Sequence, residues 1–548
     1  MEKSNVQPAM SYTSKSITYL YLLLGFYIVL FLLAIKFLEI DFQDNDDYIY
    51  TMITSGAYSG TPSALTVYEG YFYGWFVSKL YAIFSLDIEW YIVVMHGLSI
   101  LSFSAIVLKI FYIDLLSMKV KVFTSIGCFF FQVYLLLSPQ FTILAGELAL
   151  TSAVLLICTN KLRLILLAGI FAFLSIQIRF NAFAMVFIPM MPLAFLSYSR
   201  ILCIYWKKLI LVIGFITASF ILNIYTNKTY YSGDSWDYYL SFNHPRGIIE
   251  QNLCKEKAAS LFTDTIKMNE YLNMCNFGLI DGKLLSIDEM NKCASYVQNF
   301  KNDFMRQNLK PYYYGFRNHC LWLLSLWILV LIYLGIKKKK WSDLMMISSV
   351  LILSFVEILY CMNTSFVKER LIICFIFIFF ALALYFTYKL VNSRNLIYTS
   401  LLVCVLVSAF YVRKSWIWEN DVRQRLEATE ELNSLLSHLK YNKVHMLGIS
   451  PCAEAYRVSK TPCTSKYIGK GWLNNLPLHE GFYSNYLSLI DGVPIAKMKG
   501  YNKNILFIKN VLAKHYNKNV EIKTLLSSNH YEIIQFRSLD KYASSKFK

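Results

Sequence analysis

Long apolar runs separated by short polar segments dominate the first three quarters of the chain. A helix that crosses a bilayer needs about 17 to 25 predominantly apolar residues, and about eleven runs approach or meet that length. We therefore expect an α-helical polytopic membrane protein with about eleven transmembrane helices. The first run follows Lys3 and Lys15 and has no small-residue cleavage site after it, so it is predicted to be an uncleaved anchor. The predicted spans are 17–37, 90–112, 122–138, 141–158, 163–178, 181–198, 207–226, 319–336, 342–360, 370–389 and 395–412.

Two polar stretches, 227–318 and 413–548, are too long to be simple turns. The second has the size of a small domain. Its pattern favours an α/β unit, with a helical segment at 420–440 and strand-like segments at 443–449 and 531–536. We therefore divide the chain into a transmembrane module at 1–412, with a first loop at 38–89 and a large loop at 227–318, and a soluble C-terminal domain at 413–548.

Basic residues in the short loops predict the orientation, because Lys and Arg are retained on the cytoplasmic side. One set of these loops carries fifteen Lys and Arg residues, whereas the stretch from Leu38 to Glu69 has none. The N-terminus is therefore predicted to be cytoplasmic. The first loop, the large loop and the C-terminal domain then lie on the opposite side, which is the periplasmic side if the chain sits in a bacterial inner membrane.

The composition agrees with a membrane protein and excludes a disordered or fibrous chain. Hydrophobic residues make up 56% of the chain, charged residues only 16%, and the mean hydropathy is +0.43. The net charge of +18 has two sources, the basic cytoplasmic loops and a C-terminal domain with 21 basic against 11 acidic residues. A nucleic-acid partner is therefore an unnecessary explanation of the charge, and we expect the basic domain to face anionic lipid or glycan.

Motif spacing excludes several function classes. There is no Walker motif, dinucleotide glycine fingerprint or G-x-S-x-G elbow, so ATP-driven transport and serine hydrolase chemistry have no support. No cysteine spacing resembles a zinc site. We predict a Cys452–Cys463 disulfide in the C-terminal domain, because that side of the membrane is oxidising. The large loop has an odd number of cysteines, Cys254, Cys275 and Cys293, and their pairing stays open.

The first loop opens on an acidic cluster immediately after the first span. Asp44, Asp46 and Asp47 follow one another within four positions. A solvated acidic loop is the simplest interpretation. The segment 71–84 argues for more, because its aromatic residues, with Lys79 toward water, suit a helix that lies in the membrane interface. The cluster would then be held at the membrane surface.

This loop resembles a known family. The stretch from Asn45–Asp47 through Thr51–Pro62 to Ile88–Tyr91 is similar to the first periplasmic loop of GT-C superfamily glycosyltransferases, which include the O-antigen glucosyltransferases of bacterial surface-polysaccharide loci. Outside this loop only the architecture is similar. The resemblance implies a GT-C-like fold in a bacterial inner membrane. It also implies transfer of a hexose such as glucose from a polyprenyl-phosphate sugar to lipid-linked O-antigen or a related glycan.

The resemblance assigns the catalytic carboxylate to Asp46 or Asp47, with Asp44 as the third candidate. The chemistry needs such a group, because an acceptor hydroxyl is a poor nucleophile until a carboxylate takes its proton. The transition state at the sugar carbon is oxocarbenium-like, and a nearby carboxylate offsets its positive charge. A divalent metal on the three aspartates stays open, because carboxylates at this spacing suit either role.

Cations near these carboxylates would bind the phosphate of the leaving group, and arginine suits that task because its planar fork matches phosphate oxygens. Arg179, Lys368 and Arg370 are the candidates on the outer side. Arg179 could instead be a helix-end anchor, and Lys368 and Arg370 could pair internally with Glu369. We expect Arg317 and His319, which end the large loop, to have a supporting or purely structural role.

Two acids within the spans, Glu147 and Glu357, complete the set of supporting residues. A carboxylate facing hydrocarbon is costly, so each should face a cavity or a polar partner in the outer half of the membrane. Ionisable groups thus gather at the outer boundary and not at the midplane, and no internal repeat is visible, which favours an enzyme over a transporter. An O-antigen polymerase and a non-enzymatic flippase or transport component remain as alternatives.

Overall fold

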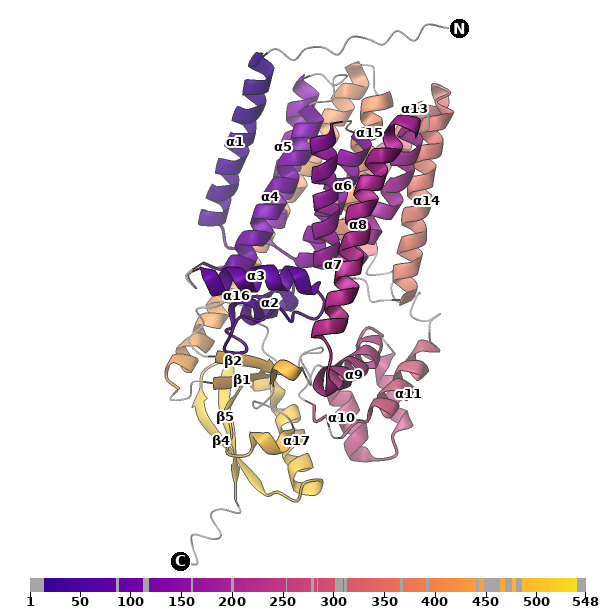
Figure 1. Cartoon of the computed structure of the whole chain (residues 1–548). Coiled ribbons are helices and arrows are strands. Elements are labelled where there is room, and N and C mark those ends of the chain that lie inside the picture. Colours follow the sequence, from indigo (N-terminus) through magenta and orange to yellow (C-terminus); the bar gives the residue numbers. More distant parts are fainter. Residues whose placement is uncertain are drawn as a thin grey trace, which may run out of the picture.

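The computed structural model describes most of the chain, with gaps at both ends and in several loops (Figure 1). It describes residues 14–84, 88–111, 118–158, 161–198, 202–252, 254–276, 280–282, 284–300, 309, 313–364, 368–390, 394–439, 443–447, 464–468, 476–479 and 485–539. The cysteines of the predicted Cys452–Cys463 disulfide lie outside these residues. The loop cysteines Cys254, Cys275 and Cys293 are buried.

The apolar runs form a helical bundle, as their length and composition predict. Eight helices among the described residues are long and apolar enough to cross a membrane, and two shorter apolar helices accompany them. Each predicted span matches one of these helices and extends at most two residues beyond its end. The bundle helices are α1 (Ser14–Phe37), α4 (Trp90–Phe111), α5 (Met118–Leu137), α6 (Phe141–Cys158), α7 (Leu162–Tyr198), α8 (Leu202–Tyr230), α13 (Leu321–Lys337), α14 (Trp341–Thr364), α15 (Glu369–Leu390) and α16 (Arg394–Ser437).

Helix α7 contains two of the predicted spans, 163–178 and 181–198, joined at a break. Arg179 at the break has φ −159° and ψ 99°, which is extended and not helical geometry. The carbonyl of Gln177 accepts a hydrogen bond from the amide of Gly70 in the first loop, at 2.7 Å. The break therefore lies at the end of the bundle where the first loop packs.

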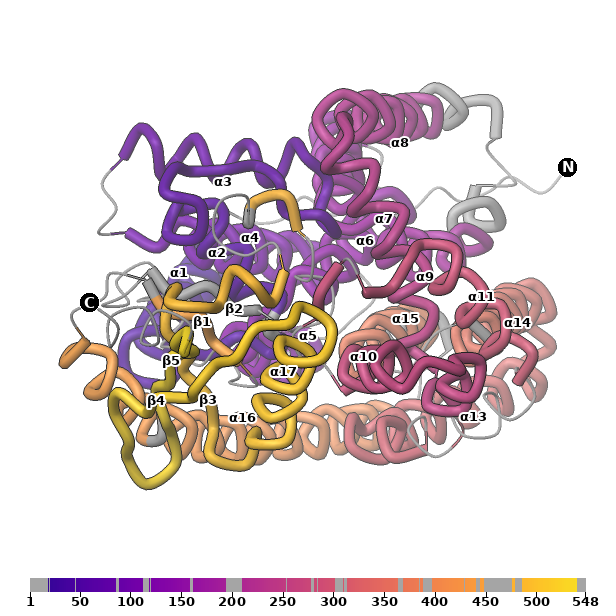
Figure 2. The backbone as a smooth tube through the Cα atoms, turned by 90° about the horizontal axis from the view of Figure 1, so that it is seen from below, coloured from indigo at the N-terminus to yellow at the C-terminus, as the bar shows by residue number. Residues whose placement is uncertain are grey.

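The first loop, the large loop and the C-terminal domain all lie at one end of the bundle, which we call the domain side (Figure 1). Helix α1 begins at the opposite end. In the first loop, α2 (Asn45–Ser55) and α3 (Tyr71–Ile83) lie across the domain side. Helix α3 exposes Trp75 and Phe76, which fits the predicted interfacial helix. The large loop contributes α9 (Asp234–Glu250), α10 (Thr265–Cys275) and α11 (Ile287–Gln298), which lie beside the C-terminal domain when seen from below (Figure 2).

A mixed sheet forms the centre of the C-terminal domain, as the predicted α/β unit requires. Its strand order is β2-β1-β3-β5-β4, with β1 parallel to both β2 and β3 and with β5 antiparallel to β3 and β4. The strands are β1 (Lys443–Leu447), β2 (Thr464–Ile468), β3 (Ile495–Met498), β4 (Val520–Ser527) and β5 (Tyr531–Ser538), and helix α17 (Asn502–Lys514) accompanies them.

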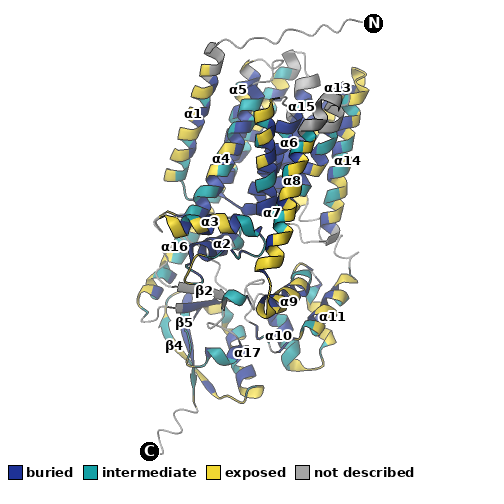
Figure 3. Cartoon of the chain, in the orientation of Figure 1, coloured by how far each residue is buried: buried dark blue, intermediate teal, exposed yellow. Residues whose placement is uncertain are grey.

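Buried residues follow the inner faces of the bundle and continue into the first loop (Figure 3). Tyr50 and Met52 of α2 are fully buried and belong to the same apolar core as Phe141 of α6. The aromatic rings of Tyr50 and Phe141 meet edge to face, with centroids 5.4 Å apart. The acidic segment at the start of α2 is thereby fixed against the bundle by apolar packing.

Candidate active site

Two of the predicted acids meet two of the predicted cations at the start of α2. Arg370, the second residue of α15, places its Nη1 2.5 Å from Asp44 Oδ2 and 3.6 Å from Asp46 Oδ2. Lys368 Nζ lies 3.7 Å from the same oxygen of Asp44. Residues more than 300 positions apart in the chain therefore form one ion-pair cluster, which we call the acid–arginine cluster: Asp44, Asp46, Lys368 and Arg370.

Asp47 lies just behind this cluster and is fully buried. Its Oδ1 accepts a hydrogen bond from the backbone amide of Phe141, at 2.9 Å, at the first residue of α6. The same oxygen accepts the hydroxyl of Tyr91, at 3.1 Å, whereas Oδ2 has no hydrogen-bond partner. Burial raises the pKa of Asp47 well above its usual range, and the negative charges of Glu69 and Asp44 raise it further.

Glu69 is the second buried acid at this site, and sequence reasoning did not single it out as a functional residue. The hydroxyl of Tyr91 contacts its Oε1 at 2.6 Å, and burial raises the pKa of Glu69 to about 8. A tyrosine hydroxyl has one proton to donate, so it can donate to Asp47 or to Glu69 but not to both. The second contact then needs a proton on a carboxyl group. Burial raises the pKa of both acids, so one of the two carboxyl groups carries that proton.

Arg179 reaches the same region through the break in α7. Its Nη1 donates to the carbonyl oxygen of Tyr68, at 2.8 Å, and its guanidinium lies over the rings of Tyr68 and Phe141, at 5.4 and 5.6 Å from their centroids. Its charge interacts with those of Asp46 and Arg370. Arg179 therefore belongs to the electrostatic environment of the acid–arginine cluster.

The approach of the first loop to this break requires glycine at position 70. A Cβ atom there would lie 2.5 Å from the carbonyl oxygen of Gln177, which is closer than real Cβ contacts allow. The hydrogen bond from Gly70 to Gln177 would be lost if the backbones moved apart. Gly70 thus holds the segment of Tyr68 and Glu69 against α7.

Helix α9 of the large loop also contacts the site, through a second arginine that the sequence did not reveal. Arg246 Nη2 donates to the hydroxyl of Tyr68, at 3.2 Å, and Arg246 forms a buried ion pair with Glu250 one turn later. Glu250 also interacts electrostatically with Lys368. The chain of contacts from Arg179 through Tyr68 to Arg246 connects the bundle to the large loop.

Glu369 pairs away from its neighbours Lys368 and Arg370. Its Oε1 lies 2.7 Å from His319 Nε2 and 3.3 Å from Lys414 Nζ. Glu369 therefore contacts His319 and Lys414 instead of forming the internal ion pair with Lys368 and Arg370 that was the alternative interpretation. His319 is buried and supports the start of α15, whereas Arg317 is exposed and lies over the ring of Tyr314, at 5.4 Å.

The two acids within the spans have separate surroundings. Glu147 of α6 is buried, and its Oε2 accepts the hydroxyl of Ser99 at 2.7 Å, so it has the polar partner that its position predicts. Glu357 of α14 is half-buried and interacts electrostatically with Cys361 and Cys374. Among the described residues, neither acid forms an ion pair with the acid–arginine cluster.

Comparisons with known proteins do not assign the chain to a family. No protein-family model and no curated protein matches it. Two solved structures are similar over nearly the whole chain, both of ArnT from Cupriavidus metallidurans. The ligand-free ArnT structure has 9% identity and a TM-score of 0.41 over 95% of this chain and 98% of ArnT. The structure bound to undecaprenyl phosphate has 10% identity and a TM-score of 0.40 over 94% and 98%. At these values the likeness carries no conclusion about function.

The geometry does not favour a divalent metal on the aspartates. Among the described residues, no group of three or more His, Cys, Asp or Glu side chains could hold a metal ion. Asp44 and Asp46 face Arg370, and one oxygen of Asp47 is taken up by Tyr91 and by the amide of Phe141.

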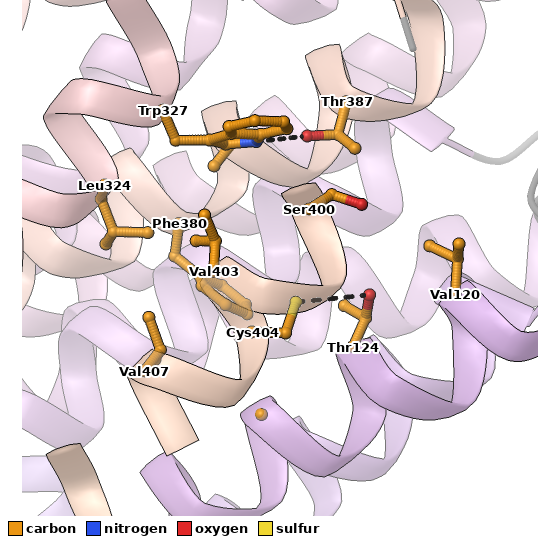
Figure 4. A pocket seen from close by; sticks show the side chains of 12 residues that line it. Val120, Thr124, Leu324, Trp327, Phe380, Thr387, Ser400, Val403, Cys404 and Val407 are labelled. Atoms are coloured by element: carbon orange, nitrogen blue, oxygen red, sulfur yellow. Dashed lines mark hydrogen bonds between the residues drawn. The ribbon is translucent and has the colours of Figure 1, made fainter. Parts of the chain in front are cut away.

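A separate apolar pocket lies inside the bundle, between α5, α13, α15 and α16 (Figure 4). Its few polar groups are satisfied within the wall, since Trp327 Nε1 donates to Thr387 Oγ1 at 2.8 Å. None of the residues of the acid–arginine cluster lines it. It offers no charged group for chemistry, so the candidate active site is the cluster on the domain side.

Proposed function

We propose that this protein is an integral-membrane glycosyltransferase of the GT-C type. It would transfer a hexose such as glucose from a polyprenyl-phosphate sugar to lipid-linked O-antigen or a related surface glycan, on the periplasmic face of the bacterial inner membrane. The observation that carries the proposal is the acid–arginine cluster at the domain side, where a carboxylate and phosphate-binding cations lie within one hydrogen-bonded site.

Asp46 is the carboxylate that we assign to the acceptor. Its side chain is 15% exposed, whereas Asp47 is fully buried. A general base has to come within hydrogen-bond reach of the hydroxyl whose proton it takes, which Asp46 can do without opening of the core. Asp47 then positions the start of α2 through its bonds to Phe141 and Tyr91.

The transfer step follows from these positions. Asp46 takes the proton of the acceptor hydroxyl while the hydroxyl oxygen forms a bond to the anomeric carbon of the donor sugar. The bond between that carbon and the phosphate oxygen breaks, and its electron pair stays on the phosphate. Arg370, with Lys368 and Arg179 nearby, stabilises the charge that develops on the leaving phosphate. The carboxylate beside the anomeric carbon stabilises the oxocarbenium-like transition state.

The position of the cluster suits a substrate that is anchored in the membrane. Helix α3 lies across the end of the bundle next to α2, with Trp75 and Phe76 exposed, as expected for aromatic side chains at the level of lipid headgroups (Figure 1). The phosphate of a lipid carrier lies at that same level. A lipid-linked donor could therefore reach Arg370 and Lys368 without leaving the bilayer.

The experiment is mass spectrometry of the surface glycan from cells with the gene, without it, and with Asp46→Asn in its place. We expect an added hexose only with the unchanged gene, on glycan chains of unchanged length. Loss of long chains on deletion would instead indicate the polymerase. Full modification by an inserted Asp46→Asn protein would overturn the assignment of the base. Membrane insertion is checked by immunoblot of membrane fractions.

A further inference from the structure

Arg370 holds two carboxylates through one nitrogen atom. Its Nη1 lies 2.5 Å from Asp44 and 3.6 Å from Asp46, and its side chain is 15% exposed. The role proposed above gives the same guanidinium a third anion, the phosphate of the donor. The N–H groups of Nη1 that face these carboxylates cannot point at phosphate oxygens at the same time.

The side chain of Asp44 is directed to these cations instead of to its own helix. Asp44 is the N-cap residue of α2, a position from which Asp usually accepts a hydrogen bond from the first turn. No such bond forms, and its Oδ2 contacts Arg370 and Lys368. The side chain is 25% exposed. An ion pair of this exposure is worth little net free energy, so a bound phosphate can displace it.

Repulsion between neighbouring cations adds a reason for such a displacement. Arg179 and Arg370 interact unfavourably with each other, and Lys368 stands beside Arg370 in the chain. Three cations gathered at one site create a positive field that attracts an anionic phosphate. The carboxylates keep the site close to neutral while the phosphate is absent.

We propose that the donor phosphate displaces Asp44 and Asp46 from Arg370. Before the donor binds, the ion pairs occupy Arg370 and neutralise the carboxylate of Asp46. When the phosphate takes Arg370, the carboxylate of Asp46 is no longer paired with this arginine and can accept the acceptor's proton. This exchange rests on the proposed function and regulates the same site. It makes the base available only when the donor is bound. The donor therefore binds before the acceptor.

Binding of geranylgeranyl monophosphate to the purified full-length protein in detergent micelles tests this exchange without catalysis. Asp44→Asn removes the competing charge but keeps a good N-cap residue, so the fold should persist. We expect about fivefold tighter binding by Asp44→Asn, the ratio that corresponds to about 1 kcal/mol for this partly exposed ion pair. Arg370→Gln should bind about tenfold more weakly. Geranylgeraniol and inorganic phosphate, measured in parallel, separate the contribution of the isoprenoid chain from that of the phosphate anion.

The double variant Asp44→Asn/Arg370→Gln distinguishes two explanations. In the first, exchange, Asp44 competes with the phosphate for Arg370. In the second, a general field effect, the negative charge of Asp44 repels the phosphate from a distance. Exchange predicts that Asp44→Asn has no effect once Arg370 is absent, whereas a general field would leave the gain intact and overturn the proposal. Unchanged or weaker binding by Asp44→Asn alone would also overturn it. So would unchanged binding by Arg370→Gln. If the unchanged protein binds geranylgeranyl monophosphate no better than geranylgeraniol, the proposed function fails as well. This result distinguishes failure of the proposed function from failure of the exchange alone.

Discussion

At the scale of single residues, the hydroxyl of Tyr91 connects the two buried acids behind the site. It contacts Asp47 at 3.1 Å and Glu69 at 2.6 Å. Tyr91→Phe would leave Glu69 Oε1 without this hydrogen-bond partner and Asp47 Oδ1 with only the amide of Phe141. An unsatisfied buried polar group costs about 1 to 3 kcal/mol, so we expect a clearly lower apparent Tm in detergent. The exposed Tyr225 provides the control, since Tyr225→Phe should leave Tm unchanged. Equal Tm values for both variants would contradict the role of Tyr91.

The sequence revealed the residues of the acid–arginine cluster but not their support. Asp44, Asp46, Lys368 and Arg370 stand out because charged residues are rare in this chain and these four flank apolar runs. Glu69 and Arg246 carry no such local signal. Glu69 is a single acid among mainly apolar and aromatic residues of a loop, and Arg246 lies in the middle of a polar stretch. Their roles come from contacts between residues far apart in the chain, which spacing along one sequence does not encode.

At the scale of elements, the close approach of the first loop to the break in α7 determines where Arg179 lies. Gly70→Ala would place a methyl group 2.5 Å from the carbonyl oxygen of Gln177 and so force the two segments apart. We expect a lower apparent Tm and reduced transfer activity. Gly97 in α4 is a matched control, because a Cβ there meets nothing within 4 Å and alanine favours a helix. A Gly70→Ala protein as stable and active as Gly97→Ala would show that the approach is not required.

Hydropathy predicted the bundle helices well, because apolar length determines a span in a membrane almost irrespective of tertiary contacts. It also separated the two halves of α7 at Arg179. The length of α16 was less predictable. Its 44 residues continue without interruption past residue 412, because an amphipathic segment extends the helix beyond the apolar run. Beyond the apolar run, Arg425 of α16 pairs with Asp41 at 2.9 Å, which connects this helix to the segment that precedes the acid–arginine cluster.

At the scale of the whole molecule, a buried polar interface joins the large loop to the C-terminal domain. Glu270 of α10 accepts the hydroxyl of Tyr486 at 2.7 Å, and Asp281 accepts the amide of Tyr486 at 3.0 Å and the hydroxyl of Tyr516 at 2.7 Å. Glu270 and Asp281 are both buried, and burial raises the pKa of Glu270 to about 8. The sequence did not predict this contact, because the polar residues lie in separate domains.

This interface should weaken as the pH rises from about 4.5 to 8. Over that range the folded protein keeps the proton of Glu270 while the unfolded chain releases it, so stability falls with pH by at most about 1.4 kcal/mol per unit. Glu270→Gln should therefore flatten the decline of the apparent Tm between pH 5 and 8. Glu256→Gln, at an exposed glutamate of the same loop, should retain the full decline. Parallel profiles for the two variants would contradict this assignment.

The central claim is that Asp46 and Arg370 form the active site of a lipid-dependent glycosyltransferase. Its most direct test is transfer of a labelled hexose from a polyprenyl-phosphate hexose to lipid-linked glycan by the purified protein in detergent. We predict transfer by the unchanged protein and a loss of at least about 100-fold with Asp46→Asn, the usual contribution of a general base. Transfer by Asp46→Asn at the rate of the unchanged protein would contradict the claim.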